Sequence, residues 1–117
     1  MTAADGPGTP ITQAYARVEP TRADVEALPG PTLLEFGAPW CGICRAAQPA
    51  IAAALANHAG VRHLKIADAS GRPLGRSFGV KLWPTLVFLR DGTEVARLVR
   101  PRDVQAIDAA LSRLRAA

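Results

Sequence analysis

The sequence predicts an α/β fold in which helices cover both faces of a central mixed β-sheet. Two observations predict it. Short apolar runs typical of buried strands alternate with helix-forming stretches, and the last two apolar runs flank Asp91-Gly92, a strong signal for a two-residue hairpin turn. The chain has 117 residues, enough for one domain, and its 49% of apolar residues can stabilise one core without metal or disulfide staples.

The start of the chain predicts a flexible tail over residues 1–12, because two glycines and two prolines fall between residues 6 and 10. The folded domain is then expected over residues 13–117. The chain does not begin with the basic and apolar segments of a secretory signal, and no apolar run approaches the roughly 20 residues of a membrane-spanning helix. We therefore expect a cytoplasmic protein with no membrane partner.

The first elements of the domain are short. Residues 14–18 predict a first strand, and Thr21 with Asp24 three residues later predicts a capping box at the start of a short helix. The apolar run over residues 32–36 is bounded by proline and glycine, which is typical of a strand buried on both faces. Glu35 is the exception within this strand.

The middle of the domain continues the alternation. An alanine-rich stretch over residues 41–58 predicts a helix that Gly60 stops and Pro49 kinks. Residues 61–67 predict a further strand, and residues 72–78 a short irregular helix.

The last elements are a hairpin and a helix. Residues 85–89 and 94–99 predict its two strands, joined through the turn at Asp91-Gly92. Pro101 is expected in the first turn of the final helix, where a missing N–H costs nothing. One apolar stripe on that helix predicts its core-facing side: Val104, Ile107, Leu111 and Leu114.

The net charge of +4 raises the question of nucleic-acid binding. Basic residues are instead spread from Arg17 to Arg115, and the densest group, Arg97, Arg100 and Arg102, has no interleaved aromatic for base stacking. We expect a solvated basic surface and no nucleic-acid partner.

The two cysteines, Cys41 and Cys44, stand between a buried strand and a helix start, the context in which C-x-x-C indicates a redox site. Unpaired N–H groups and the positive dipole at the helix start favour a thiolate on Cys41, which makes it the attacking sulfur. Cys44 lies one turn further on the same helix face, so it can resolve a mixed disulfide by attacking the first sulfur.

Three segments carry a resemblance to the thioredoxin family. Residues 34–44 (LEFGAPWCGIC) resemble its active-site strand and loop, and Pro49 stands where the family kinks the following helix. Residues 78–85 (FGVKLWPT) resemble its second signature, and Asp91-Gly92 matches its hairpin turn. The resemblance extends over about residues 14–115. It implies a thioredoxin-like fold and an enzyme that reduces protein disulfides by dithiol–disulfide exchange.

The resemblance also implies roles for individual residues. Pro84 would be a cis-proline beside the cysteines, and the backbone of Trp83 would pair with a substrate strand. Glu35 falls where the family has a buried acid that accepts the proton of the resolving cysteine, and Lys65 where it has a lysine near that acid. The remaining substrate surface would comprise Trp40, Gly42 and Ile43.

The chain departs from the family pattern at four positions. Glu35 replaces an aspartate, Gly37 an aromatic residue, Ile43 a proline, and Trp83 a smaller aliphatic residue. None of these changes removes a chemically required group. Because a lone buried carboxylate is costly, we expect Glu35 to be protonated or paired.

The resemblance implies no bound cofactor. We expect the chain to be a monomer, and the electrons for disulfide reduction must come from a partner reductase or a small thiol.

The sequence is also compatible with other interpretations. A zinc-finger spacing is matched by Cys41, Cys44, His58 and His63. In a zinc finger, however, the cysteines lie on a hairpin and the histidines on one helix, whereas here a helix begins at the cysteines and Gly60 separates the histidines. We therefore expect no bound metal, and we expect both histidines at the surface or at a helix end. The thiols could be inert, and Glu35 with Lys65 could form a purely structural pair. The chain could also be a binding or chaperone-like module, or a disulfide oxidase or isomerase.

Overall fold

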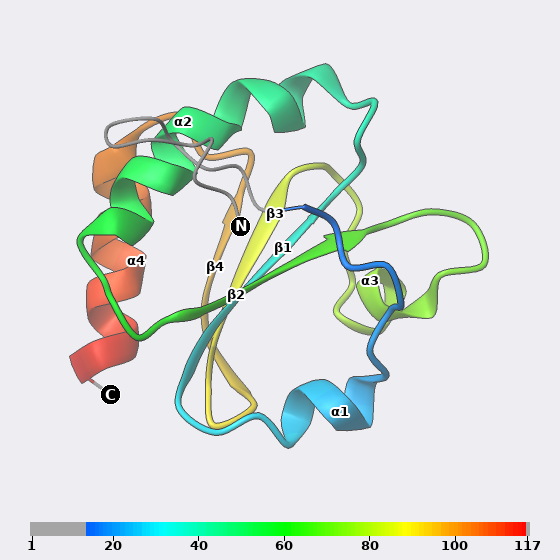
Figure 1. The fold of residues 1–117 in the computed structure, drawn as a ribbon, viewed down its shortest axis with the longest axis horizontal. Coiled ribbons are helices and arrows are strands. Elements are labelled where there is room, and N and C mark those ends of the chain that lie inside the picture. Colours follow the sequence, from blue (N-terminus) through cyan, green and yellow to red (C-terminus); the bar gives the residue numbers. More distant parts are fainter. Residues whose placement is uncertain (1–13, 117) are drawn as a thin grey trace, which may run out of the picture.

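The computed structural model describes residues 14–116, so the tail predicted over residues 1–12 lies outside the described residues. Helices and strands follow one another in the order of Figure 1: α1 (Arg22–Glu26), β1 (Pro31–Gly37), α2 (Gly42–Ala56), β2 (Arg62–Ala67), α3 (Pro73–Ser77), β3 (Thr85–Arg90), β4 (Thr93–Val99) and α4 (Val104–Ala116). No helix within residues 14–116 has the length and apolar character needed to cross a bilayer.

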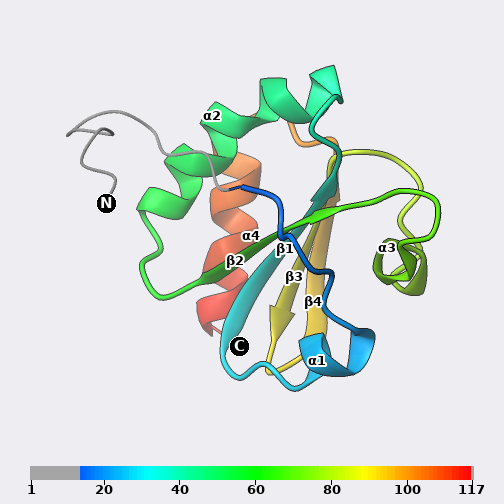
Figure 2. The ribbon, with the colours of Figure 1, turned by 45° about the vertical axis from the view of Figure 1, so that its right-hand side comes forward.

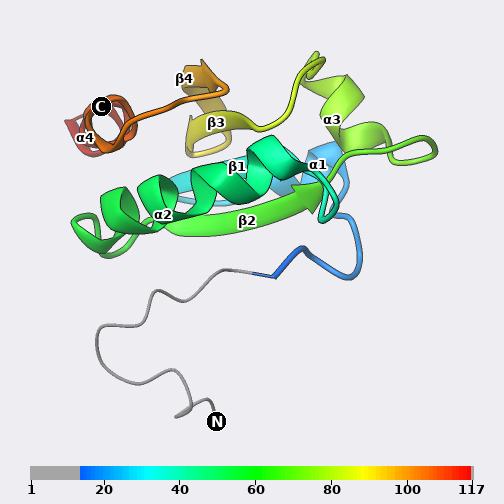
Figure 3. The ribbon, with the colours of Figure 1, turned by 90° about the horizontal axis from the view of Figure 1, so that it is seen from above.

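The sheet is mixed and has the strand order β2-β1-β3-β4, which Figure 3 shows from above. β1 runs parallel to β2 and antiparallel to β3, and β3 and β4 form an antiparallel hairpin. Helices α2 and α4 lie on one side of the sheet, and α1 and α3 on the other (Figures 1 and 2). The predicted α/β fold, with helices on both faces of a mixed sheet, is confirmed.

Alternating side chains of β1 enter two separate cores, because successive residues of a strand point to opposite faces. Leu33 packs in the core beneath α2 and α4, whereas Leu34 and Phe36 pack in the core beneath α1 and α3. All three are fully buried, and burial of each stabilises the fold by about 1.5 to 3 kcal/mol. The same alternation places Glu35 on the face of Leu33, under α2.

Local signals for caps and turns are confirmed. The Thr21 hydroxyl accepts from the Asp24 N–H at 3.0 Å and the Asp24 carboxylate accepts from the Thr21 N–H at 3.0 Å, which completes the capping box of α1. Asp91 and Gly92 have φ of 50° and 80°, as a hairpin turn of this kind requires. Of the predicted stripe on α4, Ile107, Leu111 and Leu114 are fully buried and Val104 packs beside them.

Two predictions about elements are wrong. Residues 14–18 form no strand: the segment makes one backbone hydrogen bond to β2, from the Ala16 N–H to the Lys65 carbonyl at 2.8 Å, then bends and leaves Val18 exposed. Pro101 precedes α4 instead of lying in its first turn. The Asp103 carboxylate accepts from the Ala106 N–H at 2.7 Å, and this stronger capping signal starts the helix at Val104.

Candidate active site

The two thiols meet at the N-terminus of α2. Cys41 is the N-cap residue and is partly exposed, whereas Cys44 lies in the first turn and is 1% exposed. The Cys44 N–H donates to the Cys41 sulfur at 3.2 Å. A backbone donor therefore points at Cys41, where it stabilises negative charge on the accessible sulfur, and the second thiol lies behind it.

The buried thiol is held in its protonated form. Burial, and after it the side-chain hydrogen bond with Cys41, raises the pKa of Cys44 from 9.0 to about 12. Because only a thiolate attacks a disulfide, Cys44 must lose its proton to a nearby base before it can act.

Limiting iodoacetamide at pH 7 will label Cys41 far more than Cys44. At a pKa of about 12 the Cys44 thiolate is on the order of 10⁻⁵ of the total at this pH, and burial further restricts access to it. Peptide mass spectrometry after short exposure measures the ratio, and a urea-unfolded sample, in which both cysteines should react, is the control. Preferential labelling of Cys44 in the native protein would reverse the assignment of the two thiols.

A buried polar network connects Glu35 to the turn that holds Cys44. Glu35 is fully buried, and its Oε2 accepts from Gln48 Nε2 at 2.7 Å. The same Gln48 nitrogen donates to the Cys44 carbonyl at 2.8 Å, and Lys65 Nζ donates to Gln48 Oε1 at 3.0 Å. Glu35, which we expected to be protonated or paired, is hydrogen-bonded to Gln48. Lys65 is its neighbour in strand register but reaches it through Gln48 and not by a direct ion pair.

The prediction of surface or helix-end histidines is wrong for His63 and only partly right for His58. His63 lies in β2, and its Nε2 is 2.9 Å from Glu35 Oε1. His58 follows the end of α2 but is 5% exposed and lies 2.7 Å from Asp108 Oδ1. Within residues 14–116, no three histidine, cysteine or acidic side chains gather as metal ligands. The two histidines of the zinc-finger spacing contact carboxylates instead.

Gly37 leaves room for two groups beside the network. A Cβ atom at this position would lie 2.8 Å from Cys44 Sγ and 3.0 Å from the Tyr15 hydroxyl. Burial, then the charges of Cys44, Glu35 and Cys41, raise the pKa of Tyr15 well above its usual value, so this hydroxyl stays protonated. An aromatic side chain at position 37 would fill this space, which explains the departure from the family pattern. The sequence alone gave no reason to single out Tyr15.

A small pocket of about 200 Å³ opens next to the buried thiol. Its volume exceeds the space of one water molecule, and its walls carry polar groups, so water can reach this side of the site. The lining residues are Tyr15, Ala38, Pro39, Cys44, Arg45, Gln48 and Lys65.

The residues next to Cys41 in the sequence are exposed, and one of them packs on Trp83. Trp40 is 69% exposed, and its ring meets that of Trp83 edge-to-face with centroids 5.2 Å apart. Ile43 is about half exposed, and Gly42 has open space around its Cα. The Trp83–Pro84 bond is cis, as the resemblance implies. The predicted substrate residues therefore lie together, on the α2 start and the loop before β3.

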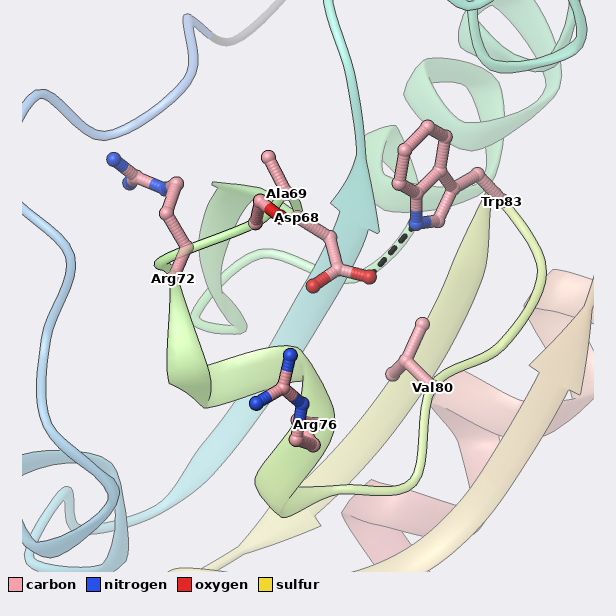
Figure 4. Close-up of a pocket in the computed structure, with 7 residues that line it drawn as sticks. Asp68, Ala69, Arg72, Arg76, Val80 and Trp83 are labelled. Carbon is pink, nitrogen blue, oxygen red and sulfur yellow. Dashed lines mark hydrogen bonds between the residues drawn. The ribbon is translucent and has the colours of Figure 1, made fainter.

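Two residues that the sequence did not single out hold Trp83 in place. Trp83 Nε1 donates to Asp68 Oδ2 at 2.8 Å across a pocket next to α3 (Figure 4). Arg100 Nε donates to the Trp83 carbonyl at 2.8 Å, and the Arg100 N–H donates to the Pro84 carbonyl at 2.8 Å. Both the indole and the backbone of Trp83 are thus fixed, with the indole against Trp40. Asp68 and Arg100 lie 15 and 17 residues from Trp83, so no local pattern marks them.

Comparisons with known proteins agree with this geometry. The family model for thioredoxin matches residues 17–113. The structure of thioredoxin 2 from Pseudomonas aeruginosa PAO1 in its reduced form has a TM-score of 0.80 and 51% identity, and the match covers 89% of this chain and 96% of that one. The thioredoxin of Chlamydia muridarum is 40% identical over 79 residues, which are 67% of this chain and 76% of the relative.

A second kind of relative is much longer. Protein disulfide-isomerase A2 of Pongo abelii is 42% identical over 81 residues, which are 64% of this chain. The chain spans 15% of that protein's length.

Proposed function

The chain belongs to the thioredoxin family, and from this premise we propose that it is a protein-disulfide reductase. The observation that carries the proposal is the thiol pair: a partly exposed Cys41 at the cap of α2 and a buried, protonated Cys44 whose N–H meets the Cys41 sulfur at 3.2 Å. An inert pair of thiols would need neither the unequal burial nor the surrounding exposed aromatic surface.

The proposed reaction has two exchange steps. The Cys41 thiolate attacks one sulfur of a substrate disulfide, so that a mixed disulfide forms and the other substrate sulfur leaves as a thiolate. Cys44 then loses its proton and attacks the Cys41 sulfur, which releases the second substrate sulfur. The substrate gains two electrons and two protons in all, and the protein becomes the Cys41–Cys44 disulfide. A reductase or a small thiol returns the two electrons.

Glu35 is proposed as the base of the second step. It is the buried carboxylate linked through Gln48 to the backbone of Cys44, and the adjacent pocket gives water a path between carboxylate and thiol. Lys65 modulates this base because its ammonium group donates to the same Gln48 side chain that donates to Glu35. The network supports an acid–base role more directly than a merely structural ion pair, since no direct Glu35–Lys65 pair forms.

Glu35→Gln will slow release of the mixed disulfide by about 10- to 100-fold and leave its formation nearly unchanged, because the base serves only Cys44. Quenched mixtures analysed by mass spectrometry should show the trapped intermediate accumulating. Glu26→Gln makes the same chemical change on the exposed face of α1 and should behave as the wild type. Equal slowing of both steps by Glu35→Gln would leave Glu35 a structural residue.

The substrate surface is proposed to comprise Trp40, Gly42, Ile43, Trp83 and Pro84. The two indoles offer large apolar contact area next to Cys41, and an extended substrate segment could pair with the backbone of Trp83. We further propose a cytoplasmic location, where thiols stay reduced and the electron donor can regenerate the pair.

Insulin reduction with dithiothreitol as donor tests the proposed function. We expect the wild type to accelerate the turbidity of precipitating insulin B chain at catalytic concentrations. A protein that binds unfolded clients but does not accelerate reduction would instead be a binding module. Faster refolding of a scrambled, disulfide-bonded substrate without net reduction would favour an isomerase or oxidase.

A further inference from the structure

His63 makes a contact that the proposed reaction does not yet use. Its Nε2 is 2.9 Å from Glu35 Oε1, on the carboxylate oxygen opposite the one that Gln48 occupies. The Glu35 side chain is fully buried, whereas 15% of the His63 side chain is exposed. His63 therefore connects the buried carboxylate to the protein surface.

The contact between His63 and Glu35 can carry away the proton that Cys44 must lose in the resolving step. In the neutral imidazole that carries its hydrogen on Nδ1, Nε2 can accept a hydrogen bond from a protonated Glu35, and in the imidazolium the Nε2–H donates to the carboxylate. The two states differ only in which atom holds the shared proton, so a proton that Glu35 has taken from Cys44 can cross this 2.9 Å contact without movement of either side chain.

Several other groups face Glu35 from the elements packed against it. They are Gln48 and Cys44 of α2, Lys65 of β2 and Tyr15 of the segment before α1, while β3 presents Leu86. An amide does not titrate, and burial raises the pKa of Tyr15 and of Cys44, so neither the hydroxyl nor the thiol ionises near neutral pH. Cys41 is blocked as a disulfide while the second step occurs. An imidazole does titrate near neutral pH.

We propose that His63 is a positioning residue for the resolving step, which receives through Glu35 the proton that Cys44 loses. The proton passes from Cys44 Sγ to the Glu35 carboxylate, then from Glu35 to His63 Nε2, and the resulting imidazolium releases a proton to water. An imidazolium has no free lone pair on Nε2 and cannot accept this proton, so the proposal predicts that the resolving step slows as pH falls. This inference rests on the proposed function and adds a pH dependence to it.

The two steps can be timed separately with 5,5′-dithiobis(2-nitrobenzoate). Attack by Cys41 releases one coloured thiolate at a rate that depends on reagent concentration, and resolution by Cys44 releases the second at a rate that does not. We expect the second rate of the wild type to fall with decreasing pH between 8 and 5. His63→Gln, which keeps a hydrogen-bond donor but cannot titrate, should lower this rate about tenfold at pH 8 and flatten its pH profile.

Three controls make the outcome decisive. His58→Gln is the same change at the other histidine, which contacts Asp108, and should keep the wild-type profile. An unchanged first rate in both variants shows that the fold is intact. The double variant Glu35→Gln/His63→Gln should be no slower than Glu35→Gln alone, because His63 acts through Glu35.

A wild-type pH profile in His63→Gln, or equal flattening in His58→Gln, would overturn the role of His63. Absence of the second release in the wild type would instead contradict the proposed reduction mechanism itself.

Discussion

Replacement of Cys41 by serine will lower the rate of insulin reduction by about 10³-fold or more. A serine hydroxyl is not ionised at neutral pH and cannot form a disulfide, so the first exchange step has no nucleophile. Cys44 cannot take over, because it is buried and its pKa is raised to about 12. Insulin turbidity measured at equal protein concentration gives the ratio of rates.

Cys44→Ser is the matched variant, since it makes the same atomic change three residues later. It should also fail to turn over, but it should accumulate a covalent adduct between Cys41 and the substrate, visible by mass spectrometry and cleaved by dithiothreitol. An adduct formed by Cys41→Ser through Cys44, or more than a tenth of the activity remaining in Cys41→Ser, would contradict the assigned order of attack.

Gly92→Ala will destabilise the protein by about 3 to 5 kcal/mol. Gly92 has φ of 80°, which an alanine adopts only with strain, and a Cβ there would overlap the carbonyl of Glu26 at the end of α1. The hairpin turn and α1 would have to separate. That movement would disturb a second contact, in which the Gly30 N–H donates to the Asp91 carboxylate at 2.7 Å. Urea unfolding followed by circular dichroism measures the change.

Gly60→Ala separates the two contributions. Gly60 has φ of 95°, but no atom lies within 4 Å of the position of an added Cβ, so this variant reports backbone strain alone. We expect a loss of about 1 to 2 kcal/mol. Equal losses in the two variants would show that the overlap with Glu26 is relieved at no cost.

Features that depend on neighbours along the chain could be predicted from the sequence. The Thr21–Asp24 capping box, the turn at Asp91-Gly92 and the C-x-x-C pair at a helix start each need residues only a few positions apart. Their geometry follows from local hydrogen bonding and backbone preference, so the structure confirms them. Local signals failed where two of them competed, as when the Asp103 cap displaced Pro101 from the first turn of α4.

The sequence by itself determined the mixed sheet with helices on both faces, the order of the elements after residue 20 and the place of both thiols. Only the tertiary structure decided what surrounds those thiols. The β1–β2 register and the position of α2 bring His63 and Gln48 onto Glu35, and the loop after β2 brings Asp68 onto Trp83. These partners lie 13 to 28 residues apart along the chain. Their contacts arise because packing of the sheet and helices, and no local pattern, sets distances across the core.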